Sequence, residues 1–304
     1  MPRTDRTVKK PPYCSQASRA AGESLYGSAP EADFWILIEY PAPWSARALA
    51  DSALPATTLR WIAEQEESLT RQGFRPRTQF IKQRGRRDVP RLLAVADTRP
   101  GRHKLVGTTF LHYEELASME LAGAGFCADA ELDPVLLVCT NGRRDRCCAR
   151  FGGPVYDALR RISPHTVWQT THLGGHRFAP AVLSLPDGLC FGRLSPDEAL
   201  ALQSGESTAI GHLRGRSAYP APVQAAECFL LNADRSARDD QFELTATEDA
   251  GAGATCVTFR DTRTGVLNRL TIGVEHRLAQ ASCGANGEKR VPHYRLLDSE
   301  QANL

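Results

Sequence analysis

The sequence lacks any long hydrophobic run. No segment approaches the ~18 apolar residues that a membrane helix needs, and the first thirty residues contain no apolar stretch typical of a signal peptide. The 304 residues are 42% hydrophobic and 24% charged, which is the composition of an ordinary globular protein. We therefore expect a cytoplasmic protein that does not bind membranes.

The sequence also lacks an excess of one charge. Lys and Arg together number 37 against 35 for Asp and Glu, so we expect no nucleic-acid partner. The arginines are nevertheless clustered, at Arg84, Arg86 and Arg87 and again at Arg143, Arg144 and Arg146. Each cluster is either a solvated loop or a docking patch for an acidic redox partner, because complementary charge speeds encounter.

Two familiar redox motifs are absent. The chain has nine cysteines but no Cys-x-x-Cys motif, which disfavours a thioredoxin-like thiol enzyme that uses Cys147 or Cys148 as nucleophile. An odd cysteine count in a cytoplasmic protein also disfavours a disulfide framework. No Gly-x-Gly-x-x-Gly follows a predicted strand, so no built-in nicotinamide or flavin module is indicated, and a separate reductase is expected.

Hydrophobic patterning predicts an α/β protein in which one order of elements occurs twice. Short helices are predicted at 15–25 and 45–53. The first unit has a strand at 34–39, a helix at 55–72, and strands at 77–83, 92–97 and 104–113. The second has a strand at 135–138, a helix at 154–161 whose start is marked by Gly-Gly-Pro, and strands at 166–170, 182–185 and 188–193. This repetition suggests two related units, the first without ligands.

The pattern changes after residue 193. Helices are predicted near 195–205 and at 222–231, followed by strands at 242–247, 255–261 and 267–275 that end in a small β-rich cap near residue 297. The predicted organisation is a tail and short helix (1–30), a ligand-free α/β unit (31–125), a ligand-bearing domain (126–235) and a β-rich C-terminal cap (236–304).

Two cysteine and two histidine positions stand where predicted strands end. Cys139 follows one strand and the pair Cys147, Cys148 follows its loop, while His172 follows the next strand and precedes His176. Two thiolates with two imidazoles suit either zinc or an iron–sulfur cluster in which histidines replace two cysteines. The cysteine spacing is too long for a zinc finger, and the histidine loop is too rich in glycine for a helix. Its glycines, Gly174 and Gly175, allow the backbone to approach an inorganic core closely.

The two segments CTNGRRDRCCARFG and WQTTHLGGHRFAP carry a resemblance to a known family. Together with Cys14-Ser15, a Gly-Glu…Leu-Tyr-Gly segment at 22–27 and an Arg-Gly-Arg-Ser…Gln-Ala-Ala-Glu segment at 214–227, they make most of the chain similar to the sucrase/ferredoxin-like family. The resemblance implies a thioredoxin-like ferredoxin domain that holds a [2Fe-2S] cluster on two cysteines and two histidines.

Matched to the family motif, the ligands are Cys139, Cys148, His172 and His176, with Cys147 as the alternative to Cys148. The supporting residues are Arg144, Asp145, Trp168, Gly174 and Gly175. Among the other cysteines, core positions are predicted for Cys127, Cys190, Cys228 and Cys256. Cys14 and Cys283 lie beside serine and glycine, so they are either reactive or, as we favour, structural.

The expected function is one-electron transfer between a reductase and an acceptor, by a redox carrier rather than a stand-alone enzyme. Neutral imidazole in place of thiolate raises the reduction potential, and loss of an imidazole proton on oxidation makes the potential fall as pH rises. A sucrase is not expected, because the motif region offers only Asp145 and Asp157 where a glycosidase needs paired carboxylates. A structural zinc site with the same ligands is the alternative.

Overall fold

A computed structural model describes residues 13–86, 90–121, 130–203, 207–234, 236–238 and 240–302. The predicted tail at 1–12, Arg87 and Cys127 lie outside the described residues. None of the helices in the described part of the chain combines the length and apolar character needed to cross a membrane.

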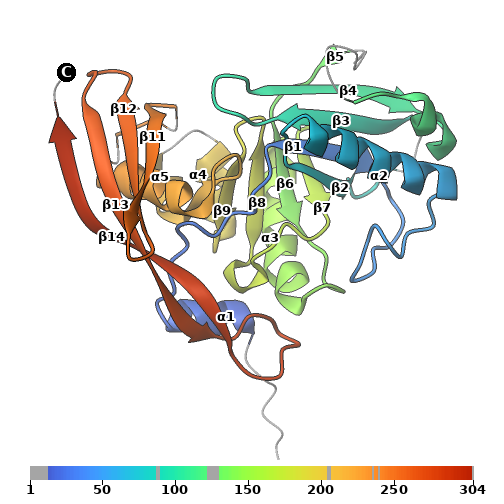
Figure 1. The fold of residues 1–304 in the computed structure, drawn as a ribbon. Coiled ribbons are helices and arrows are strands. Elements are labelled where there is room, and N and C mark those ends of the chain that lie inside the picture. The colour runs from blue at the N-terminus through green and yellow to red at the C-terminus, as the bar shows by residue number, and fades with distance from the viewer. Residues whose placement is uncertain are drawn as a thin grey trace, which may run out of the picture.

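The strands of the described residues form one large mixed sheet and one small antiparallel sheet (Figure 1). The large sheet has the order β10-β9-β8-β6-β7-β2-β1-β3-β4-β5 and the small one β11-β12-β13-β14. The large sheet consists of β1 (Phe34–Glu39), β2 (Pro76–Lys82), β3 (Arg91–Asp97), β4 (Lys104–Phe110), β5 (Ala130–Glu131), β6 (Val135–Cys139), β7 (Val167–Thr170), β8 (Ala181–Leu185), β9 (Leu189–Gly192) and β10 (Leu213–Arg216).

The predicted repetition of elements has a structural counterpart. In the first unit the order is β2-β1-β3-β4, with β1 parallel to β2 and antiparallel to β3. In the second unit the order is β7-β6-β8-β9, with β6 parallel to β7 and antiparallel to β8. The units meet where β2 pairs antiparallel with β7. The fold is therefore α/β, as predicted.

One long helix belongs to each unit, α2 (Ala56–Arg71) to the first and α3 (Arg146–Ile162) to the second. Strands alternate their side chains between two faces, so each helix packs on half of the neighbouring strand residues. The α3 side chains Tyr156 and Leu159 share a core with Val138 of β6. The other face of β6 carries Leu137 and Cys139 into a separate core that both units share.

Helix α3 begins earlier than predicted. The Gly-Gly-Pro triplet does not mark its start but lies inside it, and the helix begins at Arg146 rather than at residue 154. The Asp145 side chain accepts the N–H of Cys147 at 2.9 Å, which caps the helix at that point. The glycine at 152 serves packing instead, because a Cβ there would collide with the Cys139 carbonyl.

The predicted helix at 45–53 is also wrong, because the structure has turns there. Side chains compete with helical hydrogen bonds in this segment. The Ser45 hydroxyl accepts the N–H of Arg47 at 3.1 Å and donates to Asp51 at 2.8 Å. These contacts fix a compact turn before α2.

The remaining elements are the strands of the small sheet, three further helices and short 3₁₀ segments from both halves of the chain. The helices are α1 (Cys14–Ala20), α4 (Pro196–Gln203) and α5 (Ala221–Ala233), with short 3₁₀ segments η1 (Tyr113–Ser118), η3 (His176–Phe178) and η4 (Ser207–His212). The small sheet contains β11 (Phe242–Gly251), β12 (Ala254–Asp261), β13 (Leu267–Ala279) and β14 (Lys289–Ala302). The first three of these strands were predicted, but β14 was not, because its side chains are mostly exposed and polar.

The small sheet packs against α5. Val257 and Phe259 of β12 share a core with Val223 and Ala226 of α5. Strands β13 and β14 extend beyond this core as a long hairpin whose tip reaches α1 (Figure 1). The N-terminal helix α1 and the tip of this hairpin therefore lie together beside the start of α3.

Candidate metal centre

The ligands predicted from the sequence gather at one edge of the second unit. Cys139 ends β6, Cys148 lies in the first turn of α3, and His172 follows β7. Because β6 and β7 are parallel neighbours, their carboxyl ends meet at the same edge. One ligand atom each from Cys139, Cys148 and His172 lie within 4.8 Å of one another.

His172 stands between the cysteines and His176. Its Nδ1 lies 3.9 Å from the Cys139 sulfur and 3.7 Å from the Cys148 sulfur. Its Nε2 lies 3.2 Å from Nδ1 of His176. Both cysteines are buried, whereas the His176 side chain is 15% exposed. The group thus has a buried thiol side and a histidine side nearer to solvent.

Close packing of α3 on β6 brings the two cysteines together. A Cβ at position 152 would fall on the carbonyl of Cys139, whereas one at Gly153 would meet nothing within 4 Å. Only the first glycine of the pair is therefore needed for contact. It allows the first turns of the helix to approach the strand end closely enough for Cys148 to join Cys139.

Two arginines hold the backbone of the histidine loop. Arg77 donates to the carbonyl of His172 at 2.9 Å, and Arg214 donates to the carbonyl of Gly174 at 3.1 Å. Arg214 is fully buried, and burial lowers the pKa of its guanidinium to about 10. Gly175 has a left-handed backbone with φ of 67°, and a Cβ there would collide with Arg214. The loop conformation therefore depends on glycine and on this buried cation.

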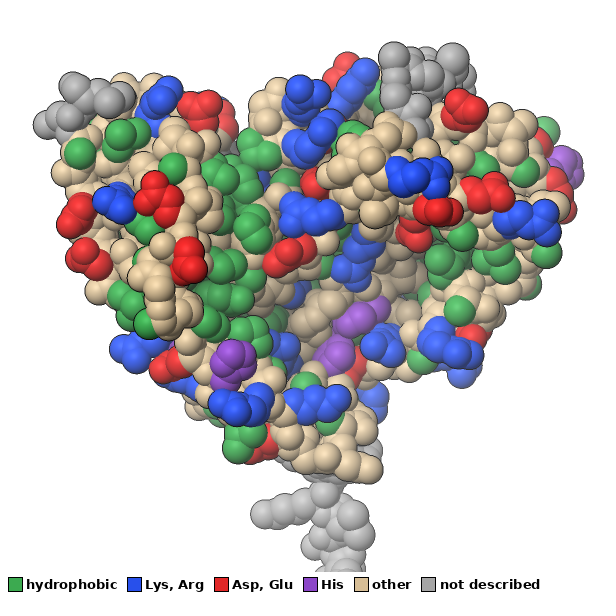
Figure 2. All heavy atoms as spheres, in the orientation of Figure 1, with side chains coloured by type: hydrophobic (Ala, Val, Ile, Leu, Met, Phe, Trp, Pro, Cys, Tyr) green, Lys and Arg blue, Asp and Glu red, His purple; other side chains and the backbone are tan. Residues whose placement is uncertain are grey.

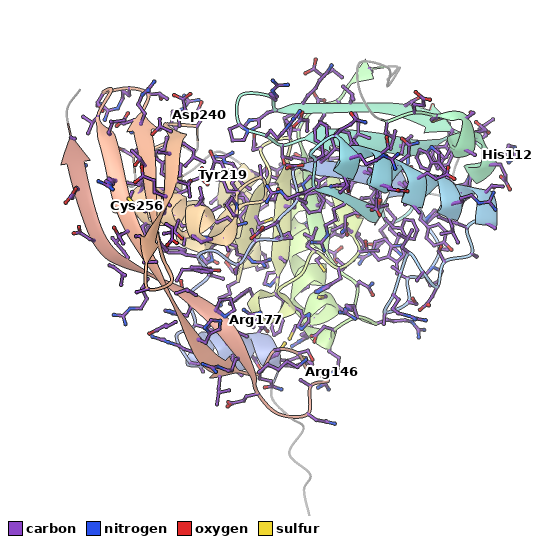
Figure 3. All side chains as sticks on the ribbon, viewed as in Figure 1. His112, Arg146, Arg177, Tyr219, Asp240 and Cys256 are labelled. Carbon is purple, nitrogen blue, oxygen red and sulfur yellow. The ribbon has the colours of Figure 1, made fainter. Side chains whose placement is uncertain are left out.

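A buried acid holds the other end of the loop. Glu23 accepts the Nε–H of Arg177 at 2.6 Å and the hydroxyl of Ser18, also at 2.6 Å. Arg177 lies near α1 in Figure 3 and directly follows His176 in the chain. The sequence segments around Gly22-Glu23 and Arg214 that supported the family resemblance thus contact the histidine loop.

The two neighbouring thiols differ in acidity, and Cys139 loses its proton more easily than Cys148. A hydrogen bond from Cys148, opposed by burial and assisted by His172, holds the pKa of Cys139 well below its usual value. The same contact with Cys139, together with burial, raises the pKa of Cys148. A metal that binds both sulfurs must therefore displace a proton from Cys148.

Asp145 is buried beside His176. Its Oδ2 is 3.7 Å from Nε2 of His176. Burial lowers the pKa of His176, and the Asp145 charge opposes that shift while His172 adds to it. Burial would raise the pKa of Asp145, but N–H groups of Cys147 and Cys283 stabilise its carboxylate, and the net shift is downward.

The other predicted site residues lie around this group. Trp168 shares the core of Cys139, and Arg144 is exposed. Asp157 is paired with Arg84 at 2.6 Å and Asp145 caps α3, so neither carboxylate is arranged for glycoside hydrolysis. The predictions of core positions for Cys190, Cys228 and Cys256 are confirmed, because all three are buried.

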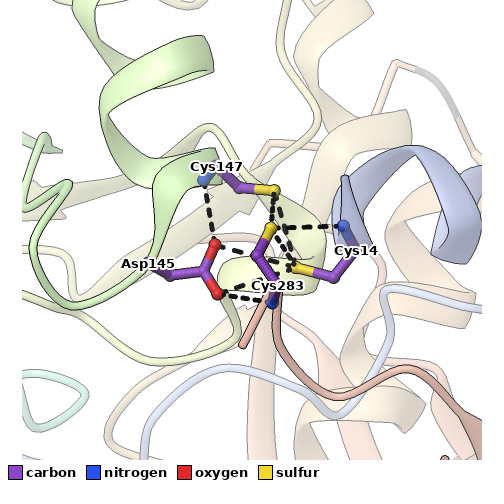
Figure 4. Close-up of side chains that lie close together, drawn as sticks. All are labelled: Cys14, Asp145, Cys147 and Cys283. Carbon is purple, nitrogen blue, oxygen red and sulfur yellow. Dashed lines mark hydrogen bonds between the residues drawn. The ribbon is translucent and has the colours of Figure 1, made fainter. Parts of the chain in front are cut away.

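Cys147 belongs to a different group. Its sulfur lies 3.5 Å from that of Cys14 and 3.2 Å from that of Cys283, and the Asp145 carboxylate lies beside them (Figure 4). Cys14 and Cys283 were each expected to be structural on their own, and their meeting with Cys147 was not predicted. The adjacent pair Cys147, Cys148 held a signal, because neighbouring helix residues point about 100° apart and so serve different sites.

Comparison with protein families places the chain. The model of the family described as sucrase/ferredoxin-like matches residues 25–204. The chain belongs to the sucrase/ferredoxin-like family. The matched segment includes Cys139, Cys148, His172 and His176, whereas Cys14 and Cys283 lie outside it. Comparison with curated proteins and with solved structures gives no match.

Proposed function

We propose that this member of the sucrase/ferredoxin-like family is a one-electron carrier with a [2Fe-2S] cluster on Cys139, Cys148, His172 and His176. The observation that carries the proposal is the convergence of two thiols and an imidazole from the end of β6, the start of α3 and the loop after β7, with a second imidazole in contact. The expected donor of electrons is a separate reductase. The acceptor is a second protein, and the expected compartment is the cytoplasm.

The donor set fits such a cluster. Cysteine sulfur and histidine nitrogen are the ligands of clusters in which two histidines replace two cysteines. The four residues lie in the same small region, and the thiol of Cys139 is already acidic. The bound cluster would supply a single electron at a potential above that of an all-cysteine ferredoxin.

The burial of the proposed ligands indicates the side on which electrons would leave the site. Cys139 and Cys148 are buried, so electrons would leave through the half-buried histidines. Histidine side chains lie near the middle of the face in Figure 2, beside a hollow and surrounded by basic side chains. His176, partly exposed and beside Asp145, is the group placed to exchange a proton with water.

The two arginines behind the loop would tune the carrier. Arg214 and Arg77 place positive charge behind the histidine backbone without reaching the ligand nitrogens. Positive charge favours the reduced form, because reduction adds an electron. The same residues fix the ring positions, as supporting residues do in many metal sites.

Anaerobic purification with iron and sulfide analysis tests the proposal. We expect about two irons and two sulfides per chain, as the formula of the cluster requires, and a red-brown colour that dithionite bleaches. A colourless protein that contains zinc in this site and no sulfide would overturn the proposal. That result would support the alternative of a structural zinc site, which the 4.8 Å grouping of three ligands also allows.

A further inference from the structure

A second group of metal-type ligands lies beside the first. Cys14 begins α1, Asp145 and Cys147 stand at the start of α3, and Cys283 lies in the loop that joins β13 to β14 (Figure 4). Cys14 and Cys283 are 269 positions apart in the chain. Three sulfurs and one carboxylate from three distant segments thus meet at one point.

The spacing of these atoms is close to that of ligands around a tetrahedral ion. The three sulfur–sulfur distances are 3.2, 3.5 and 3.6 Å, and the Cys14 sulfur lies 3.8 and 3.9 Å from the two Asp145 oxygens. A tetrahedral zinc ion with bonds of about 2.3 Å to sulfur and about 2.1 Å to oxygen separates its sulfurs by about 3.8 Å and sulfur from oxygen by about 3.6 Å. The observed sulfur–sulfur distances are shorter than these values and the sulfur–oxygen distances slightly longer, and the four ligand atoms all lie within 4.8 Å of one another.

The Asp145 carboxylate is held in place but can still bind a metal ion. One Asp145 oxygen accepts the N–H of Cys147 at 2.9 Å and the other accepts that of Cys283 at 2.8 Å. A carboxylate has about four acceptor positions, so each oxygen keeps one for a metal. The sulfurs also accept hydrogen bonds, from the N–H of Cys14 to Cys283 and from the hydroxyl of Ser15 to Cys147. Such bonds disperse the negative charge of a thiolate site.

The surroundings are closed and apolar. Cys14 and Cys147 are fully buried and pack with Ala179, Tyr13 and Phe151. The rings of Tyr13 and Phe151 meet edge to face at 5.4 Å. A closed site of four protein ligands is typical of structural zinc, whereas catalytic zinc keeps one position open.

A disulfide accounts for less of this arrangement. It would join two of the three sulfurs at about 2.0 Å, leaving the third thiol without a role. Calcium and magnesium prefer oxygen ligands, and copper(I) prefers sulfur alone. Zinc accepts both three thiolates and a carboxylate.

We propose that Cys14, Asp145, Cys147 and Cys283 bind a structural zinc ion that is distinct from the iron–sulfur site. The ion ties α1 and the β13–β14 hairpin tip to the start of α3, and so closes the protein over Asp145 and His176. Adjacent residues divide the two sites between them, with Cys147 facing zinc and Cys148 facing the cluster. The proposal does not depend on the identity of the metal at Cys148.

Metal content of full-length variants tests this assignment. We expect the wild type to contain about one zinc per chain at this site, lost in Cys14→Ser and Cys283→Ser, with iron unchanged. Cys139→Ser should lose iron and keep that zinc, and Cys256→Ser, a buried cysteine of β12, should keep both. If the first site holds zinc instead, Cys283→Ser should still lose one of two zincs, so failure of the electron-transfer proposal is distinguishable.

Thiol labelling tests the proposal on the wild-type protein, so the result does not depend on whether a variant folds. We expect Cys283, partly exposed, to resist N-ethylmaleimide in the native wild type and to react at least tenfold faster after a zinc chelator is added. Peptide mass analysis locates the label. Three results would each overturn the proposal. The first is an unchanged zinc content in Cys14→Ser and Cys283→Ser, and the second is a labelling rate that the chelator does not change. The third is a disulfide between any two of the three cysteines in protein purified under reducing conditions.

Discussion

At the scale of single residues, the most informative feature is the division of roles between two adjacent cysteines. The Cys148 sulfur faces His172 at 3.7 Å, while the Cys147 sulfur faces Cys283 at 3.2 Å. The family motif alone left open which of the two would ligate the proposed cluster. In the structure the two side chains pack in different places, because α3 begins before both residues and successive helix residues point in different directions.

This division predicts opposite effects of two similar substitutions. Cys148→Ser should lose essentially all iron and sulfide, because serine is a poor replacement for thiolate at a soft metal. Cys147→Ser should keep the visible absorption of the wild type, since its sulfur is directed elsewhere. Absorption spectra and iron content of the two purified variants provide the measurement. Loss of the cluster in Cys147→Ser with retention in Cys148→Ser would reverse the assignment.

A second residue-scale prediction concerns pH. The oxidised site holds an imidazole proton less tightly than the reduced site, so the potential should fall as pH rises, by up to about 59 mV per pH unit for each coupled proton. The Asp145 charge raises the pKa of His176 against the effect of burial. Asp145→Asn should therefore move the start of the fall to lower pH, because the carboxylate charge no longer opposes the effect of burial on the pKa of His176.

Voltammetry between about pH 6 and 10 provides the measurement. Asp157→Asn is the matched control, because Asp157 is an exposed carboxylate on the same helix that pairs with Arg84. It should leave the curve unchanged. A potential that does not vary with pH in the wild type would show that no histidine proton is coupled to the electron.

At the scale of elements, α3 shows what local sequence signals miss. Gly-Gly-Pro is a sound signal for a helix start, yet the helix passes through it because Asp145 caps an earlier turn. The strands of both units were predictable, because continuous apolar runs such as Phe34–Glu39 are buried on both faces. The role of the glycine at 152 was not, since it depends on a carbonyl brought near by tertiary packing.

The glycine pair in α3 gives an element-scale prediction with a built-in control. Gly152→Ala should destabilise the protein by about 1–3 kcal/mol, because its Cβ would displace the helix from the Cys139 carbonyl. Gly153→Ala should stabilise it by about 0.5–1 kcal/mol through helix propensity alone. Chemical denaturation gives both values, and iron content should fall only in Gly152→Ala. Equal effects at the two positions would show that α3 does not depend on this close approach.

At the scale of the whole molecule, the two α/β units share a strand order but not a site. The residues that follow β1 include two prolines where the second unit has its cysteine loop, so the first unit offers no matching ligands. The lack of ligands after β1 was predictable, because it can be read from one short segment of the sequence. The meeting of Cys14 with Cys283 was not, since spacing of 269 residues carries no information about contact until the hairpin of β13 and β14 is in place.

Surface charge leads to a whole-molecule prediction. Arg144 is exposed, and its charge lowers the pKa of His176 as a smaller contribution after that of burial, so it lies close enough to affect the histidine side. Basic side chains surround the histidines on the face shown in Figure 2. If electrons leave on this side, replacing a basic residue there by an acidic one should slow the reaction with an anionic oxidant and speed that with a cationic one, because opposite charge raises the encounter rate.

Stopped-flow oxidation of the reduced protein by ferricyanide and by hexaammineruthenium(III) measures this bias. Arg144→Glu should slow the reaction with ferricyanide about 2–10-fold at low ionic strength and speed that with the ruthenium cation. Arg60→Glu, an exposed position on α2, is the matched control and should change neither rate appreciably. In 1 M salt, where the Debye length is about 3 Å, the difference between Arg144→Glu and wild type should disappear. Equal responses to Arg144→Glu and Arg60→Glu would mean that electrons do not leave beside the histidines.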